Sequence, residues 1–445
     1  MSTIADAATL MPAAEPTDLP GRDRNRILVY LGFLVFVLGF GAPFGGLISL
    51  PVTFFLKNKL HLHASEVAQF VFVAGAPLYV GFLWGFVRDL WNPFGLRDRG
   101  YMIIFGVLCA AIYAYFAFVP LGTGASATTT LMIASILMTM AFLFVQSGQT
   151  GLAATVARQH VMSGQMSSVM NGVLSVATLI PFVAGGYLSD QLEGKNADQA
   201  AKTLFLVGAG VMAFMALFAL WRPRVVYDNV HPEHDKQFHP LQDAKRLFSH
   251  WPVYPALGIW FLWNFAPGSA TPLQFYLQNT LHATDSQWSW WQGLFAAGFI
   301  PTYALFGFLC RKMPLRRLLF WGTIVAVPQM LPLIFVNSVP ISLVVALAAG
   351  LMGGVATAAY LDLLIRSCPK GLEGTILMAS NALYYLVSRL GDILGTYLYD
   401  KFHGFLVCAV AITVVYALIV PALWLVPKRL TATADGEAPE GGFDA

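Results

Sequence analysis

The segment GFVRDLWNPFGLRDRGY, residues 85–101, covers the junction of two apolar runs at 66–88 and 101–121. Each run is long enough to cross a bilayer, which takes about 20 mostly apolar residues. The segment that joins them is short and rich in charge. Two membrane spans connected by a short charged turn are therefore the first predicted element of the fold.

The same pattern extends over the whole chain. Of its 445 residues, 57% are hydrophobic and 11% are charged, whereas a soluble domain carries about 25% charged residues. We therefore predict an all-α polytopic membrane protein with twelve transmembrane helices. The apolar runs that predict them are 27–56, 66–88, 101–121, 126–157, 165–189, 203–221, 251–279, 287–310, 316–336, 340–366, 374–399 and 404–427.

One long polar loop, residues 222–250, divides the spans into two groups of six. Its four histidines are irregularly spaced and have no cysteine partner, so we predict a linker and no metal site. No cofactor is expected either. The predicted division is a disordered cytoplasmic N-terminus (1–26), an N-terminal six-helix bundle (27–221), a cytoplasmic linker (222–250), a C-terminal six-helix bundle (251–427) and a disordered cytoplasmic tail (428–445).

The distribution of Lys and Arg predicts the orientation. With the N-terminus inside, 20 of the 26 basic residues fall on the cytoplasmic side, five fall outside, and Arg389 lies within a span. This bias follows the positive-inside rule. It predicts a multi-pass protein of the plasma membrane, of bacterial inner-membrane type, with both termini cytoplasmic. The expected partner is the lipid bilayer, the net charge of +3 gives no reason to expect nucleic acid, and we expect a monomer.

The two groups of six spans resemble each other at corresponding places. Ala42-Pro43 interrupts the first span, and Ala266-Pro267 interrupts the seventh. Spans five and eleven share residue types at an offset of 210, in the pairs Gly164 and Gly374, Asn171 and Asn381, and Asp190 and Asp400. These matches predict two pseudo-symmetric halves. Interrupted helices at matching positions also indicate a cavity near the middle of the membrane.

The opening segment also carries a motif, with Gly85, Asp89, Arg97 and Arg99 in order. It resembles the signature of the major facilitator superfamily between spans two and three. The resemblance implies a gate, in which Asp89 accepts hydrogen bonds from a neighbouring helix N-terminus and pairs with arginine. The arginines could instead only fix the topology. Span eight repeats Gly307 and a basic pair but no acid, so we predict an asymmetric gate.

Three stretches narrow the resemblance to one branch of that superfamily. They are Pro77-Leu-Tyr79 with Pro93-Phe94-Gly95, the Pro267 to Tyr276 stretch, and the Pro369 to Asn381 stretch. They are similar to the folate–biopterin transporters and to the related photosynthetic-antenna assembly proteins. The resemblance implies a small-molecule substrate that is an organic anion, with a folate- or pterin-like molecule as one possibility.

Two charges lie inside span eleven. Arg389 lies about 14 residues into the span, roughly 21 Å along the helix, and Asp392 follows on the same face. A charge at this depth costs about 2.5–3.5 kcal/mol, so both should face the protein interior. In one interpretation they pair with each other. In the other, Arg389 binds an anionic substrate through its planar fork, and Asp392 takes a proton.

Uncharged polar and aromatic residues complete the candidate site. Amides in spans four, seven and eleven could contact a solute, and two rings could stack on a flat heterocycle. For each of them, packing between helices is the alternative role. The predicted substrate-binding residues, besides Arg389, are Gln146, Gln149, Asn264, Asn381, Tyr79 and Trp263.

Together these features predict a secondary active transporter that works by alternating access and is coupled to protons. One alternative is a proton-driven exporter, suggested by the Pro181 to Gly186 stretch of span five. Another is a non-transporting assembly factor for membrane complexes. No phosphate-binding loop, metalloprotease motif or nucleophile elbow occurs, and we expect no enzyme activity.

Overall fold

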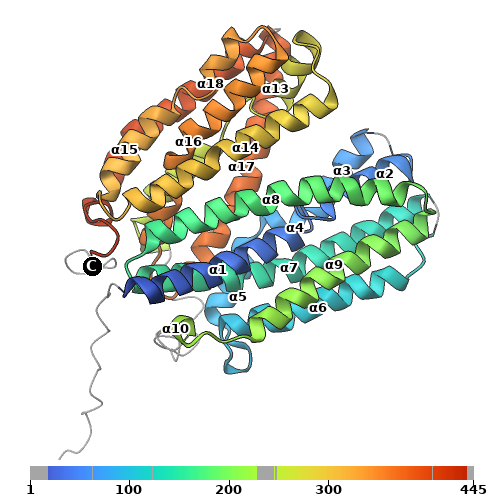
Figure 1. Ribbon diagram of the computed structural model, residues 1–445, viewed down its shortest axis with the longest axis horizontal. Coiled ribbons are helices and arrows are strands. Elements are labelled where there is room, and N and C mark those ends of the chain that lie inside the picture. Colours follow the sequence, from blue (N-terminus) through green and yellow to red (C-terminus); the bar gives the residue numbers. More distant parts are fainter. Residues whose placement is uncertain are drawn as a thin grey trace, which may run out of the picture.

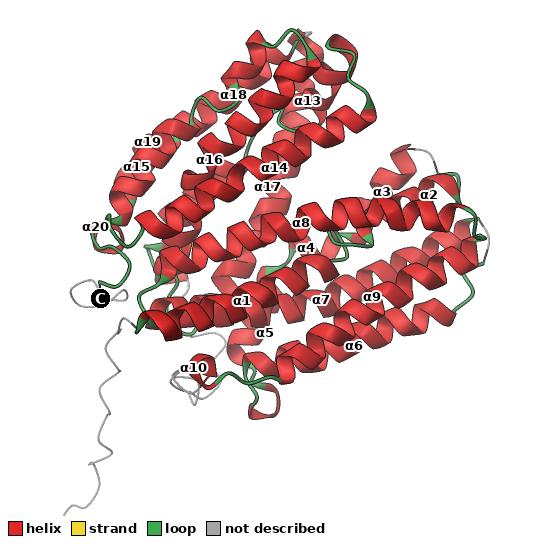
Figure 2. Ribbon diagram, in the orientation of Figure 1, coloured by secondary structure: helices red, strands yellow, loops and turns green. Residues whose placement is uncertain are grey.

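The computed structural model describes residues 19–62, 64–122, 124–227, 245, 248–402 and 404–437, and this part of the chain contains helices and no strands (Figures 1 and 2). Within it, eight helices are long and apolar enough to cross a membrane. The remaining predicted spans are broken into shorter helices or are the two more polar helices α8 and α17. The predicted all-α polytopic fold is confirmed.

The N-terminal half holds the first six spans. Span one is the long helix α1 followed by the shorter α2, span two is built from short helices, and spans three to six are each one helix. The elements are α1 (Gly21–Gly41), α2 (Ser49–Asn58), α3 (Ala64–Ala74), α4 (Ala76–Tyr79), α5 (Phe82–Leu90), the 3₁₀ turn Pro93–Gly95, α6 (Asp98–Phe118), α7 (Ala125–Gln159), α8 (Ser163–Glu193) and α9 (Ala197–Leu220). The short α10 (Arg224–Tyr227) follows.

The C-terminal half holds the other six spans in the same order. Its elements are α12 (Val253–Asn264), α13 (Thr271–Phe275) with a π turn at Tyr276–Thr280, α14 (Asp285–Leu309), α15 (Leu315–Ala326) with the 3₁₀ turn Leu331–Phe335, α16 (Val339–Ser367), α17 (Glu373–Phe402), α18 (Phe405–Ala417), α19 (Ile419–Ala422), the 3₁₀ turn Leu423–Leu425 and α20 (Lys428–Thr431). Figure 1 shows the two halves as separate bundles, blue to green and yellow to red.

Both predicted helix interruptions are present. Helix α1 ends at Gly41, just before Pro43, and the chain becomes helical again only at Ser49. Helix α12 ends at Asn264, before Pro267, and α13 begins at Thr271. Proline lacks an N–H donor and clashes with the preceding turn, so each break follows from the local sequence.

Several helix pairs join the halves, among them α5 with α17 and α8 with α14. At the first contact a Cβ on Gly85 would overlap the carbonyl oxygen of Gly374. At the second, a Cβ on Gly307 would lie 2.6 Å from Ser168 Oγ. Glycine at both positions therefore lets the helices of opposite halves approach closely.

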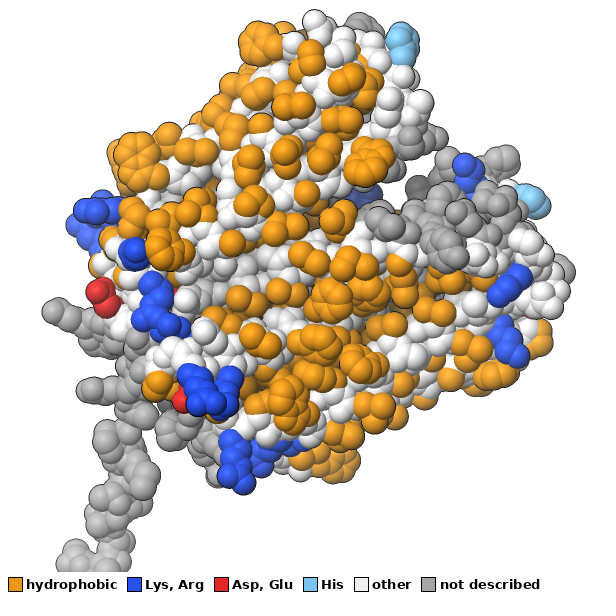
Figure 3. Space-filling model, in the orientation of Figure 1, with side chains coloured by type: hydrophobic (Ala, Val, Ile, Leu, Met, Phe, Trp, Pro, Cys, Tyr) orange, Lys and Arg blue, Asp and Glu red, His pale blue; other side chains and the backbone are white. Residues whose placement is uncertain are grey.

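The two ends of the bundle differ. Lys and Arg gather mainly at the end that carries α10, α20 and the 91–97 turn, which we call the basic end (Figure 3). Toward the opposite end, the space-filling view shows a hollow between the halves. Orange apolar side chains cover most of the visible flanks, as expected for a surface that faces lipid.

The tail differs from the prediction of disorder over residues 428–437. There the chain forms α20 and then packs against the basic end, with Asp435 only 4% exposed. The sequence pattern could not reveal this, because the tail has no apolar periodicity and is held by polar contacts. Residues 1–18, most of the predicted linker and residues 438–445 lie outside the described part of the chain.

Candidate functional site

Asp89, predicted from the motif to belong to a gate, joins the two halves at the basic end. Its Oδ1 accepts a hydrogen bond from the backbone N–H of Gly374 at 3.2 Å, and its Oδ2 accepts one from that of Thr375 at 2.6 Å. The Thr375 hydroxyl donates to the same Oδ2 at 2.7 Å. Asp89 lies at the end of α5, and its acceptors face the start of α17, where unpaired N–H groups and the helix dipole favour an anion. We call this contact the first lock.

An arginine beside Asp89 balances its charge. Arg88 donates through Nη1 to Asp89 Oδ1 at 2.6 Å and through Nε to Asp98 Oδ1 at 2.6 Å, with both partners buried. Close by, Arg158 of α7 pairs with Glu373 of α17 at 3.2 Å, which is an ion pair between the halves. Sequence reasoning did not assign roles to Arg88, Arg158 or Glu373.

The two arginines predicted to belong to the gate lie away from Asp89. Arg99 donates to the carbonyl oxygens of Ala219 and Leu220, at 3.2 and 2.8 Å, and so caps the end of α9. Its guanidinium also lies over the ring of Tyr227, 5.6 Å from the centroid. Arg97 directly precedes α6, and its backbone N–H donates to Asn92 Oδ1. These contacts hold the 91–97 turn and the end of α9 near Asp89.

A second aspartate makes the matching contact from the other half. Asp435 of the tail accepts hydrogen bonds from the backbone N–H groups of Gly164 and Gln165, at 3.1 and 2.8 Å. These two residues begin α8 and correspond to Gly374 and Thr375 in the predicted repeat. The N–H of Asp435 donates to the Cys310 carbonyl oxygen at 2.9 Å, which holds the tail against the end of α14. We call this contact the second lock.

A buried arginine also supports the second lock. Arg366 of α16 donates through Nη2 to Asp435 Oδ1 at 2.9 Å and through Nε to Asp362 Oδ1 at 2.8 Å. Its Nε also reaches Ser163 Oγ at 3.0 Å, across the interface between the halves. The predicted asymmetric gate is therefore corrected: the loop after span eight has no acid, but the tail supplies one.

Burial changes the acidity of this tail carboxyl. Removal from water, reinforced by the nearby Asp362 carboxylate, raises the pKa of Asp435 to about 6, although Arg366 and the two backbone N–H groups act in the opposite direction.

Arg389 lies farther along α17, on the helix face that packs against the N-terminal half nearer the start of the helix. Met378 and Ala382 share its helix face and are buried, Met378 against Leu78 and Leu143 of the N-terminal half. Arg389 follows Ala382 by about 10 Å of helical rise, and there the side chain is exposed. Among the described residues it has no acidic partner, so the predicted pairing with Asp392 is absent from this structure.

Asp392 instead holds the broken seventh span. Its Oδ1 accepts a hydrogen bond from the Thr271 N–H at 2.9 Å, and its Oδ2 accepts one from the Thr271 hydroxyl at 2.8 Å. Thr271 is the first residue of α13, directly after the Ala266-Pro267 interruption. The carboxylate thereby links the position of α17 to the position of α13.

The predicted residues of span seven are mostly used within their own half. Trp263 is 8% exposed and stacks on Tyr416, with ring centroids 4.7 Å apart. Asn264 is half-buried, and its Nδ2 donates to the Trp260 carbonyl oxygen at 2.8 Å. Trp263 therefore belongs to the core of the C-terminal half.

The remaining predicted residues lie on helices at the interface between the halves. Gln149 of α7 is 2% exposed, and its Nε2 has no hydrogen-bond partner within the described residues. Gln146, one turn earlier, is half-buried, as is Asn381 of α17. Tyr79 at the end of α4 lies 5.5 Å from the Phe72 ring, by centroids, and is also half-buried.

Comparisons with known proteins agree with this arrangement. The chain matches the family described as Major Facilitator Superfamily over residues 35–391, with a further match over 268–443. It is 22% identical over 361 residues to a folate-biopterin transporter of Synechocystis sp., covering 78% of this chain and 70% of that protein. It is also 22% identical over 382 residues to folate transporter 1 of Plasmodium falciparum, covering 79% and 70%. The fold is similar to that of the proton:xylose symporter XylE, with a TM-score of 0.66, 14% identity, and coverage of 93% and 98%.

Proposed function

Because the chain belongs to the Major Facilitator Superfamily and is thus a multi-pass membrane transporter, we propose that it moves a small organic anion by alternating access. The substrate would bind between the two halves near the middle of the membrane. The two halves would then rock about this site so that it opens to one side at a time.

The exposure of Arg389 is the observation that carries the proposal. A cation at this depth is costly, and a purely structural arginine would be expected to pair with an acid. This one has no acidic partner within the described chain and is exposed, beyond the part of its helix face that packs against the N-terminal half at Met378. A carboxylate of the substrate would supply the missing charge through two parallel hydrogen bonds.

The surroundings of Arg389 support a substrate that combines an anion with a flat ring. Tyr384 is 44% exposed and Tyr385 lies beside it, with ring centroids 5.1 Å apart. Aromatic rings at this position could stack on a planar heterocycle. The named relatives include a folate-biopterin transporter and a folate transporter. We therefore propose a folate- or pterin-like anion as the first substrate class to test.

Proton coupling is assigned to Asp392. A deprotonated carboxylate can accept both hydrogen bonds from Thr271, whereas a protonated one would lose part of this capacity. Taking up a proton would therefore loosen the link between α17 and α13. Such a link would connect protonation to the movement of the broken span, close to the proposed substrate arginine.

The two locks would hold the basic end shut while the opposite side is open. Rocking toward the other state would break both contacts together, because each joins residues of opposite halves. The positive-inside pattern supports a cytoplasmic basic end and cytoplasmic termini. We propose that the protein acts as a monomer in the plasma membrane.

Uptake into proteoliposomes tests the proposal. Purified protein would be reconstituted and offered folates, pterins, amino acids, sugars and other organic anions, with and without an inward proton gradient. We expect accumulation of an anion that depends on the gradient. Arg389→Ala should abolish it, Arg389→Lys should retain a part with a raised KM, and Asp392→Asn should flatten its pH dependence.

Arg224→Ala serves as the matched control, because Arg224 is exposed at the basic end and outside the hollow. Normal uptake by Arg389→Ala would overturn the substrate site. Efflux of the anion from loaded vesicles, driven by a proton gradient in the absence of uptake, would favour the exporter. Failure of the whole panel in both directions, with folded protein, would favour an assembly factor.

A further inference from the structure

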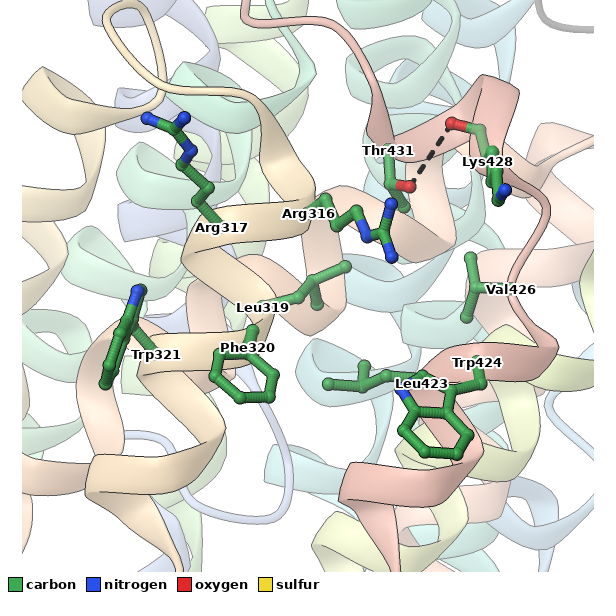
Figure 4. Close-up of a pocket in the computed structure, with 10 residues that line it drawn as sticks. All are labelled: Arg316, Arg317, Leu319, Phe320, Trp321, Leu423, Trp424, Val426, Lys428 and Thr431. Atoms are coloured by element: carbon green, nitrogen blue, oxygen red, sulfur yellow. Dashed lines mark hydrogen bonds between the residues drawn. The ribbon is translucent and has the colours of Figure 1, made fainter.

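A groove on the outer side of the C-terminal half lies away from the hollow between the halves. It runs between the start of α15 and the segment that joins the last span to the tail, and its volume is about 640 Å³ (Figure 4). Arg316, Leu319 and Phe320 of α15 face Leu423, Trp424 and Val426 across it.

The upper part of the groove in Figure 4 is cationic. Arg316 extends into the groove toward Thr431, and Lys428 lies on the opposite rim, while Arg317 extends away from the groove. None of the ten lining residues is acidic. Within the described residues, Arg316, Arg317 and Lys428 have no acidic partner, so no carboxylate of this part of the chain balances their charge.

The lower part of the groove is aromatic and apolar. Phe320 and Trp424 lie below the cations in Figure 4, and their side chains are 40% and 81% exposed. The apolar surface continues along α15 at Val325, which is 49% exposed, and along the last span at Leu425, which is 63% exposed. Tryptophan at such a position is typical of the boundary between lipid and water.

The geometry points to an anionic glycerophospholipid of the surrounding bilayer as the occupant of this groove. Its phosphodiester would lie between Arg316 and Lys428, since arginine matches phosphate oxygens in a planar fork and lysine adds a point charge. Its acyl chains would follow the exposed apolar surface of α15 and of the last span. Basic pockets between spans on this side of a membrane recognise anionic headgroups by the same chemistry.

The bound lipid would also brace the tail. The groove joins α15 to α20, and the residues that follow α20 lead directly to the second lock. The Leu315 N–H already donates to the Thr433 carbonyl oxygen at 3.4 Å, and Arg366 donates to the same oxygen at 3.0 Å. A headgroup that bridges Arg316 and Lys428 would strengthen this attachment. The inference stands independently of which solute is transported.

Thermal unfolding of the full chain in mixed micelles tests the site. The micelles would contain phosphatidylglycerol or phosphatidylcholine in the same detergent, and a third sample would contain soluble glycerol phosphate. We expect Tm to rise by about 3 °C or more with phosphatidylglycerol relative to phosphatidylcholine, since a ligand that binds the folded state stabilises it. Glycerol phosphate alone should give little of this shift.

Three variants make the test specific. Arg316→Ala combined with Lys428→Ala should lose at least half of the difference between the two lipids, and Arg316→Lys should keep most of it. Arg224→Ala, at the same end of the other half, should behave as the wild type. Equal Tm values in both lipids, an unchanged difference in the double variant, or a full shift with glycerol phosphate would each overturn the assignment to a lipid.

Discussion

The two locks at the basic end use one chemistry but differ in the source of the acid. In each, an aspartate of one half accepts hydrogen bonds from two consecutive N–H groups that begin a long helix of the other half. Asp89 belongs to the transmembrane helix α5, whereas Asp435 belongs to the tail after the last span. The comparison teaches that the repeated fold fixes where an anion is needed, because both helices present N–H groups there. It does not fix which segment supplies the anion.

The locks also differ in how firmly the acid is held. Each aspartate has two N–H donors and a buried arginine. Asp89 also accepts a hydrogen bond from the Thr375 hydroxyl and lies on a packed helix, so it cannot leave without moving α5. The additional contact of Asp435 is weaker, 3.6 Å from Cys310 Sγ, and Asp435 lies on a short segment. Substitutions at the first lock should therefore reduce stability and transport more than the matching substitutions at the second lock.

The largest difference is expected from the two close-approach glycines. Gly85→Ala places a methyl group against the backbone of Gly374, which cannot rotate away, and overpacking of this kind costs about 1–3 kcal/mol. We expect the transport rate to fall about tenfold or more. Gly307→Ala meets the side chain of Ser168, which can turn aside at the loss of its 2.6 Å hydrogen bond to the Tyr303 carbonyl. Its rate should fall only about twofold, as expected for a loss nearer 0.5 kcal/mol. Equal losses measured by solute flux would contradict the ranking.

The next effect concerns the acid of the first lock. Asp89→Asn removes charge-assisted hydrogen bonds, which are worth about 1.5–3 kcal/mol, and leaves Arg88 with Asp98 alone. We expect the free energy of unfolding in a fixed detergent to fall by about 2 kcal/mol. Asp435→Asn should cost clearly less, because burial already favours a neutral group at this position and the amide oxygen can still accept a hydrogen bond from the backbone N–H groups. A larger loss of unfolding free energy for Asp435→Asn than for Asp89→Asn would contradict this comparison of the two locks.

Removal of the tail opens only the second lock. Cys310 is 1% exposed beneath Asp435, so deletion of residues 433–445 should raise its rate of alkylation by about tenfold or more, the factor that about 1.4 kcal/mol of lost protection gives. Measurements in single-cysteine backgrounds would compare Cys310 with Cys109, which is buried within the N-terminal half and should not change. A parallel rise at Cys109 would mean general unfolding and would count against a local lock.

The smallest effect is a dependence of the second lock on pH. Burial raises the pKa of Asp435 to about 6 from an ordinary value near 3.8, so the docked tail binds a proton more tightly than the free tail does. Docking should therefore be strongest below about pH 4 and should weaken as the pH rises through about 6. Hydrogen exchange of residues 428–437, corrected for the intrinsic effect of pH, would measure this. Asp435→Asn should remove the slope, and protection that increases with pH would contradict the assignment.

The sequence predicted the features of the fold that depend on local patterns. Apolar runs identified the spans, proline marked the breaks at Pro43 and Pro267, and the offset of 210 paired the starts of α8 and α17. The motif also identified Asp89, whose role in joining the halves the structure describes in detail. These signals are local because helix formation and helix breaking depend on neighbouring residues.

Contacts between distant residues could not be predicted in the same way. Asp435 lies 271 residues from Gly164, in a polar tail without periodicity. The missing acid after Gly307 was a hint that another segment is needed, but no local signal identifies that segment. Likewise, Trp263 belongs to a core whose rings come from other spans, and Arg88, adjacent to Asp89, pairs with it in place of Arg97 or Arg99. Each of these outcomes depends on tertiary packing.

The place of Asp435 in the chain also sets an order of assembly during synthesis. A ribosome delivers a membrane protein from its N-terminus, and every residue of the first lock precedes position 376. That contact can form while the last span is still being made. The partners of Asp435 in α8 and α14 must wait until the tail has left the ribosome. The nascent transporter therefore passes through a stage in which one side of its basic end is sealed and the other is still open.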